Sequence, residues 1–360
     1  MTEADESRIA EPVVVDADVE LATEVVARPV RRPVVGRVVA RVAGLAITAI
    51  GLYVIWPALV QTFSQLPRLQ TINPAWFVAM VAVETASFAS FWVLLGLCVH
   101  SRDRFVIATS QLASNMIGRI VPGGAATGGA MQLRMLIVGG VDAARATTGV
   151  ATATLLTTAV LFGMPVLSVP AILGGATISD GLAGAVFLGL LLFAIMIAVG
   201  VLALRSDRPV LVIGRTFAAA VSLVTRGDRD ADLPARLLRE RDLVRRTLDR
   251  HRWTALGSAV AKSILEYLAL LAALTAVGAS PRPGLVVLAY TASAILAMVP
   301  ITPGGLGFVE AGLSATLTLA GVTVADAVLA TLAFRLVSYW LPLPIGALAL
   351  ALFRRRFGRI

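Results

Sequence analysis

The chain has 360 residues, of which 58% are hydrophobic and 15% are charged, and its mean hydropathy is +0.85. Soluble domains carry about a quarter charged residues, so this composition excludes a soluble globular protein and indicates an all-α, polytopic membrane helical bundle. The net charge of +9 comes largely from arginines at the ends of apolar runs and in one long loop, as membrane topology requires. We therefore expect no nucleic acid partner.

Residues 1–34 combine acidic residues, Val and Ala with Arg-Pro pairs and show no sustained period, which predicts a disordered cytoplasmic tail. Residues 35–356 are predicted to form one transmembrane domain. A span needs about 20 apolar residues. The runs that satisfy this length predict six full spans, at 42–63, 75–99, 144–172, 181–204, 253–278 and 326–352.

Two further apolar stretches, 105–139 and 284–320, are each interrupted near the middle by a Pro-Gly-Gly triplet. Proline and glycine disfavour the interior of a helix. Each stretch is therefore either one broken span or a pair of half-helices that enters and leaves on the same side of the membrane. The triplets are Pro122-Gly123-Gly124 and Pro303-Gly304-Gly305.

The two triplets indicate an internal duplication. They begin at Pro122 and Pro303, 181 positions apart, and two glutamates inside apolar runs, Glu84 and Glu266, are 182 positions apart. The same landmarks recur in the same order at nearly the same spacing, which is typical of transporters built from structural repeats. The predicted repeat units are about 75–172 and 253–352.

The distribution of arginine decides the topology. The positive-inside rule places the Arg-rich segment 205–252 and both Arg-rich chain ends in the cytoplasm. The Arg-rich segment and the two chain ends lie on one side only if both interrupted stretches are re-entrant, that is, if each enters and leaves the membrane on the same side. The repeat is then inverted, two opposed half-helix hairpins enter from opposite faces, and their tips meet near the middle of the membrane.

The Arg-rich segment also has a pattern of its own. Within 205–252, leucines recur at helical spacing among the arginines. This pattern fits a helix that lies on anionic inner-leaflet lipids, and it fits a solvated helix equally well.

Ionisable residues inside the apolar runs are the candidate substrate-binding groups, because a charged side chain within the membrane is energetically costly and usually has a function. Lys262 and Glu266 are four positions apart and can form a structural pair, and Glu310 also suits the start of a helix. For each of these three residues, a role in substrate binding or proton relay is the alternative interpretation. The candidates are Glu84, Arg119, Arg134, Lys262, Glu266, Glu310 and Arg335, with the tip residues Pro122, Gly123, Gly124, Pro303, Gly304 and Gly305.

Motifs of enzymes are not found in the sequence. We find no HExxH, no GxSxG, no phosphate-binding GxxxxGK[ST] and no cluster with metal-ligand spacing. We therefore expect a protein that is not an enzyme and that uses no metal or cofactor.

The order of these features resembles the lysylphosphatidylglycerol synthase transmembrane region, a flippase-like module. The specific part is the segment from Thr302 to Gly312 together with Arg335, followed by Tyr339, Pro342, Pro344 and Gly346. The resemblance extends over about 41–356. In full-length members such a module moves an aminoacylated phospholipid between leaflets, and a separate soluble domain makes that lipid. The resemblance implies a stand-alone module without the synthase domain, since we expect the chain to end after its last span.

The leading hypothesis is a lipid flippase or scramblase in the cell membrane. The arginines would hold an anionic headgroup, and the glutamates would meet a cationic group or relay protons. The alternatives are a secondary transporter of a small solute, a membrane enzyme that modifies lipids, or a non-catalytic subunit of a lipid-modifying system. The expected partner is a phospholipid or lipid-linked substrate, and homo-oligomerisation, the lipid's identity, and the direction and energy coupling of transport stay open.

Overall fold

The computed structural model describes residues 73–121, 124–170, 233–298 and 303–358, with single helical positions between 184 and 198. All of these belong to the unit Thr48–Ile360, one of the two units of the chain. The predicted tail at 1–34, the span at 42–63, most of the span at 181–204 and most of the Arg-rich segment lie outside the described residues. Pro122 and Gly123 lie outside them as well.

All of the regular structure in the described part of the chain is helical. Four helices are long and apolar enough to cross a membrane, and they coincide with the predicted spans at 75–99, 144–172, 253–278 and 326–352. The first is α3 (Pro74–Cys98), and the second is α6 (Ala143–Gly163) together with the 3-10 turn η1 (Met164–Ser168). The third is the second half of α10 (Leu233–Ala276). The fourth consists of α13 (Val324–Arg335), the π-helical turn η3 (Leu336–Trp340) and α14 (Pro342–Phe357), which follow one another without a break.

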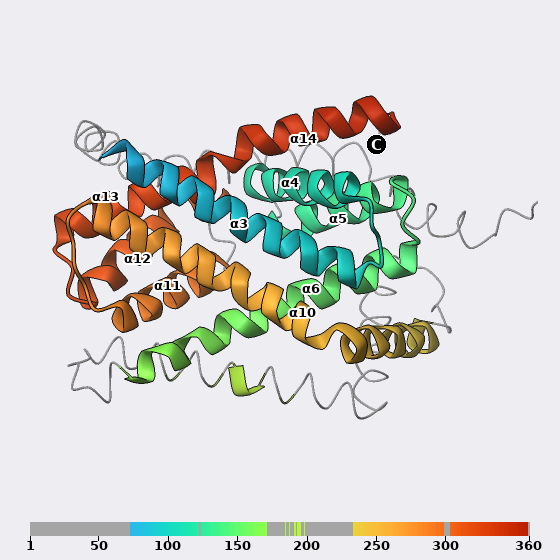
Figure 1. Ribbon diagram of the computed structural model, residues 1–360, viewed down its shortest axis with the longest axis horizontal. Helices are drawn as coiled ribbons and strands as arrows, with labels where there is room; N and C mark the ends of the chain where they lie inside the picture. The colour runs from blue at the N-terminus through green and yellow to red at the C-terminus, as the bar shows by residue number, and fades with distance from the viewer. Residues whose placement is uncertain are drawn as a thin grey trace, which may run out of the picture. The chain divides into compact units, whose positions relative to one another are not determined.

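The interrupted stretches form two pairs of shorter helices. The first pair is α4 (Arg104–Ile120) with α5 (Gly124–Val138), and the second is α11 (Pro283–Ala297) with α12 (Phe308–Leu319). Figure 1 shows α4 and α5 side by side. Each break coincides with its predicted Pro-Gly-Gly triplet, since α4 ends before Pro122 and the short turn η2 (Pro303–Gly305) separates α11 from α12.

Close contacts show that the helices of each pair are antiparallel. In the first pair, a Cβ on Gly128 would lie 2.7 Å from the Ser114 carbonyl oxygen, and a Cβ on Gly139 would lie 2.5 Å from Val106. Late residues of α4 therefore contact early residues of α5. In the second pair, Gly312 lies against Leu296, and the Thr316 hydroxyl lies 3.4 Å from the Ala289 carbonyl oxygen.

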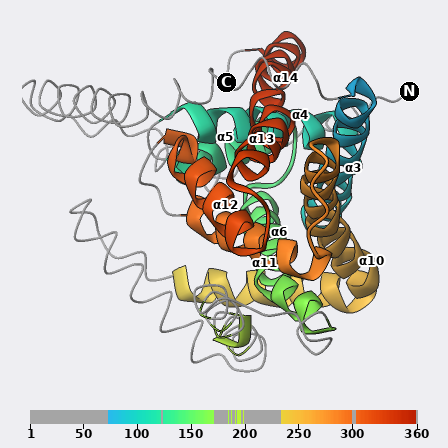
Figure 2. The same cartoon turned by 90° about the vertical axis from the view of Figure 1, so that its left-hand side faces the viewer.

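The antiparallel helices α3 and α10 lie side by side (Figures 1 and 2). The Ser87 hydroxyl donates to the Lys262 carbonyl oxygen over 3.1 Å. On one side of this contact Met80 shares a buried cluster with Leu270, and on the other side Leu95 shares a second cluster with Ala259. Consequently Glu84 and Glu266 lie at nearly the same level of the two helices.

The two hairpins open toward opposite ends of the α3–α10 pair. The α4–α5 hairpin follows the last residue of α3, whereas the α11–α12 hairpin follows the last residue of α10. The final helix α14 packs on α4, and η1 packs on α11. Each hairpin is thus covered by an element from the other half of the chain.

Four helix ends share the same cap, in which two backbone N–H groups bond back to the last turn. At the ends of α5, α10 and α12 the left-handed position is taken by a glycine, with φ of 89° at Gly140, 81° at Gly278 and 93° at Gly321. At the end of α3 the same position is taken by His100, with φ of 53°. His100 is the only non-glycine residue with a positive φ in the described part of the chain.

The α4–α5 contact yields a stability prediction. We expect Gly128→Ala to destabilise the protein, because overpacking costs about 1–3 kcal/mol and the new Cβ meets backbone rather than a movable side chain. The adjacent Gly129→Ala is the control: nothing lies within 4 Å of a Cβ there, so helix propensity should make it neutral or stabilising by up to about 1 kcal/mol. Thermal unfolding of both variants in detergent measures the difference, and equal midpoints would contradict this packing.

Candidate functional site

The two helical tips meet at Gly304. Its φ is 63°, and a Cβ there would lie 2.8 Å from the carbonyl oxygen of Arg119 and would collide with the Tyr339 hydroxyl. Arg119 is the second-last residue of α4, next to the first tip. Glycine is therefore required at position 304 both by backbone conformation and by the close approach of the two tips.

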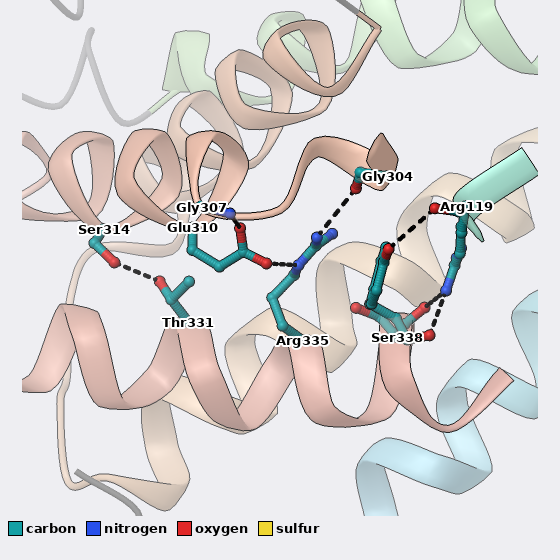
Figure 3. Close-up of polar contacts among 9 residues, drawn as sticks. Arg119, Gly304, Gly307, Glu310, Ser314, Thr331, Arg335 and Ser338 are labelled. Atoms are coloured by element: carbon teal, nitrogen blue, oxygen red, sulfur yellow. Dashed lines mark hydrogen bonds and ion pairs between the residues drawn. The ribbon is translucent and has the colours of Figure 1, made fainter. Parts of the chain in front are cut away.

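Arg335 and Glu310 form an ion pair beside this contact, as Figure 3 shows. The Arg335 Nε lies 2.7 Å from the Glu310 Oε1, and the side chains are only 12% and 16% exposed. The second oxygen of Glu310 accepts the Gly307 N–H over 2.7 Å at the start of α12. Glu310 is therefore the helix-start residue that the sequence suggested, and it is also the counter-ion of Arg335.

Arg119 binds the backbone at the π-helical turn. Its Nη1 donates to the carbonyl oxygens of Ser338, over 2.9 Å, and of Tyr339, over 2.7 Å (Figure 3). A π-helical turn shifts the hydrogen-bond register and makes carbonyl groups available to other donors. The first half of the chain is thus joined to the last span by a charge-assisted contact.

Tyr339 holds the two arginines together. The guanidinium carbon of Arg335 lies 4.2 Å from the centre of its ring, and that of Arg119 lies 4.9 Å from it. A cation over an aromatic face is stabilised by the ring quadrupole. Sequence reasoning did not assign Tyr339 to the site; its position four residues after Arg335 was the available signal.

A second charged group lies between α10 and α11. The Lys262 Nζ is 2.7 Å from both carboxylate oxygens of Glu266, and the Tyr290 hydroxyl donates to Glu266 over 2.8 Å. The pair is about one quarter exposed. The spacing of four residues predicted this ion pair correctly, and Tyr290 adds a donor from the neighbouring helix.

Glu84 lacks such compensation. It is 5% exposed, and its Oε2 has no hydrogen-bond partner among the described residues. The position four residues before it is Met80, whereas Glu266 has Lys262 at that spacing. A buried polar group without a partner requires an explanation, and a ligand or a proton would provide one.

Arg119 connects the two charged groups. Its guanidinium lies within electrostatic range of Arg335, Glu84 and Glu266. The described cluster therefore runs from Glu310 and Arg335 through Arg119 to Glu84, and then to the pair of Glu266 and Lys262. We call these six residues the central charge cluster.

The remaining predicted residues lie elsewhere or at the tips. Arg134 is exposed on α5 and makes no hydrogen bond or ion pair with the described residues, so no contact joins it to the central charge cluster. Gly124, with φ of 51°, begins α5, and Gly305, with φ of 71°, is buried at the second tip. Pro303 is the first residue of η2.

Comparison with known families identifies the chain. Residues 41–346 match the family model of the lysylphosphatidylglycerol synthase TM region. The chain belongs to this family. The match includes every residue of the central charge cluster, and together with the four apolar helices it identifies a multi-pass membrane protein. No curated protein matches the chain.

In this member of the lysylphosphatidylglycerol synthase TM family, the site contains both positively and negatively charged side chains that a ligand could contact. Glu310 accepts from the Nε of Arg335, and the Gly304 carbonyl oxygen lies 3.5 Å from its Nη2. The Ser338 and Tyr339 carbonyls accept from one nitrogen of Arg119. Each guanidinium has five N–H donors, so further donors are left for an anionic oxygen. Glu84 provides a carboxylate oxygen that can accept a proton or a cationic group.

The ion pair of Glu310 and Arg335 should stabilise the folded protein. Removing one partner of a buried ion pair lowers the free energy of unfolding by about 3–5 kcal/mol. We expect the loss in Arg335→Ala to be near the lower end of this range, because both side chains keep some exposure. Adding Glu310→Gln should restore part of the loss, since the amide oxygen still accepts the Gly307 N–H without a charge. Thermal unfolding of the single and double variants tests this, and a double variant less stable than Arg335→Ala would contradict it.

Proposed function

We propose that the protein is a lipid translocase, a flippase or scramblase that moves a phospholipid or a lipid-linked headgroup between the leaflets of the cell membrane. The observation that carries the proposal is the central charge cluster at the contact of two helical tips. Charged groups in a membrane interior are rare and mark substrate or ion pathways. A lipid headgroup is a polar substrate that must cross this interior.

The chemistry of the cluster suits a phospholipid headgroup. Arg119 and Arg335 can bind a phosphate, because the planar guanidinium matches its oxygens in a bidentate manner. Glu84 can accept an amine of the headgroup or carry a proton, because its oxygen has no partner among the described residues. A headgroup that carries both signs would engage both sets.

We also propose that the two halves of the chain form an inverted repeat whose hairpins are re-entrant. Support comes from the antiparallel pair of α3 and α10 and from the hairpins that open toward opposite ends of this pair. It also comes from the packing of α14 on the first hairpin and of η1 on the second. Inverted repeats of this kind place a substrate site at the repeat interface and expose it alternately to the two sides. In this proposal the contact of Gly304 with Arg119 forms part of that interface.

The orientation we propose places the end of α3, the start of α4 and the end of α14 in the cytoplasm. The basic residues of the described chain gather there, and they include Arg102, Arg104, Arg354, Arg355 and Arg356. The opposite end, with the starts of α11 and α13, carries Arg282 and Asp326. The positive-inside rule then gives a cytoplasmic C terminus, and the Arg-rich N-terminal region places the N terminus on the same side.

Cysteine labelling tests this orientation. In a background with Cys98→Ala, we expect Arg282→Cys to react with a membrane-impermeant maleimide in intact cells, because its side chain is exposed at the outer end. The matched Arg355→Cys, also exposed, should react only after the cells are opened. The reverse labelling pattern would overturn the proposed orientation.

Reconstitution tests the activity. Liposomes that contain the purified chain should lose fluorescence of inner-leaflet lipids to an external quencher faster than empty liposomes. We expect Arg335→Lys and Glu84→Gln each to slow this movement at least about tenfold, equivalent to about 1.4 kcal/mol in the barrier, since Lys lacks the planar fork and Gln lacks the titratable charge.

Arg355→Gln removes an exposed charge outside the cluster and serves as the control, with an expected rate close to that of the unmodified chain. Lipids with zwitterionic, anionic and aminoacylated headgroups should be compared in the same assay. If none of them moves faster than in empty liposomes, the translocase proposal fails, and a transporter of small solutes becomes the better hypothesis.

A further inference from the structure

A groove with a volume of about 1060 Å³ lies where α3 ends and α4 begins. None of the residues that line it belongs to the central charge cluster. One wall consists of apolar side chains of α3, namely Trp92, Val93 and Leu97. Small residues, among them Ala89 and Gly96, leave room beside them.

The rim of the groove is basic. Four exposed side chains contribute to it: His100, Arg102 and Arg104 from the turn and the start of α4, and His251 from α10. The chain contains two histidines, and both of them line this groove. Residues from two separate parts of the sequence therefore converge on one edge.

The carboxylate nearest this rim is bound to other groups. Asp103 lies between Arg102 and Arg104, but its Oδ1 accepts the backbone N–H groups of Phe105 and Val106 at 2.9 and 3.1 Å. Its Oδ2 lies 3.5 Å from the Arg356 guanidinium of α14. Asp103 is thus engaged in capping α4 and in the contact with α14.

Both histidines occupy irregular backbone positions. His100 has the left-handed conformation that glycine takes at the three equivalent helix ends, and a side chain with a Cβ is disfavoured there. His251 interrupts α10 with φ of −124° and ψ of 22°. The left-handed backbone of His100 is unfavourable, and residues held in such conformations cluster at ligand sites, because the surrounding structure must maintain them.

From these observations we infer that the groove binds a phospholipid with an anionic headgroup. The phosphate lies among His100, Arg102, Arg104 and His251, where charge-assisted hydrogen bonds are available. One acyl chain runs along Trp92, Val93 and Leu97. From Leu97 to Ala89 the helix rises about 12 Å, which accommodates the upper half of an acyl chain.

A lipid fits this groove better than a soluble anion. A soluble phosphate would use the rim alone, whereas the apolar wall continues along a helix that is long enough to span the membrane. Trp253, which is 74% exposed and lies under the Arg252 guanidinium, is two residues after His251. Tryptophan is enriched at the membrane surface, so this neighbour places the rim at headgroup depth.

Native mass spectrometry of the delipidated full chain tests the inference. We expect dioleoyl phosphatidylglycerol to bind about tenfold more tightly than dioleoyl phosphatidylcholine, since only the former carries a net charge at the headgroup. The double variant Arg102→Ala/Arg104→Ala should lose this preference. The control Arg354→Ala/Arg355→Ala removes two exposed charges at the same end of the protein, outside the groove, and should keep it. Equal losses in both double variants would overturn the inference.

His100→Gly separates binding from folding. Glycine relieves the left-handed backbone, so we expect a higher melting temperature together with weaker binding of phosphatidylglycerol. A variant that binds phosphatidylglycerol as tightly as the unmodified chain would contradict a role for the His100 ring in the site. Because binding is measured without transport, this outcome is independent of the translocase proposal.

Two further measurements locate the lipid. Phosphatidylglycerol with brominated acyl chains should quench the tryptophan fluorescence of the chain, and Trp92→Phe should remove most of the quenching. Glycerol 1-phosphate, which has the headgroup phosphate without acyl chains, should not displace the lipid at equal concentration. Quenching that persists in Trp92→Phe, or displacement by glycerol 1-phosphate, would contradict an acyl chain in this groove.

Discussion

A guanidinium group inside a membrane protein must be compensated, and the compensation of Arg335 organises the second half of this chain. Glu310 supplies the charge and at the same time caps α12 through the Gly307 N–H. Tyr339, one helical turn further along the same span, supplies an aromatic face. The start of α12 and the last span are therefore fixed to each other by one side chain, and that contact places Gly304 against the carbonyl oxygen of Arg119.

The two halves of the chain differ in the charges they carry. In the second half, Glu266 has a cation from its own helix and a hydroxyl donor from α11. In the first half, Glu84 is buried, and its Oε2 has no hydrogen-bond partner among the described residues. A pair in which all groups are satisfied is a structural element, whereas an unsatisfied carboxylate is free to exchange partners. In our account Lys262 and Glu266 hold α10 and α11 together, and Glu84 is the group that changes its state.

The sequence predicted the features that depend on local pattern. Four spans, both helix breaks and the pair of Lys262 and Glu266 follow from hydropathy, Pro-Gly-Gly triplets and a spacing of four. Features that depend on tertiary packing were not predictable. The carbonyl oxygens that bind Arg119 are presented by a π-helical turn, and neither their role nor that of Tyr339 can be inferred from composition. Arg134 was predicted as a site residue from its place in the half-helix after the first tip and from the resemblance, and in the structure its side chain is exposed.

The central claim is that both halves of the chain contribute to one site, and a double-mutant cycle on lipid movement in liposomes tests it most directly. Arg119 comes from the first half and Arg335 from the second, and both contact the ring of Tyr339. Groups that act in one site are non-additive. Our account predicts that Arg119→Ala/Arg335→Ala moves lipid no more slowly than the slower single variant. Rates that fall by the product of the two single effects would show two independent sites and would contradict the account.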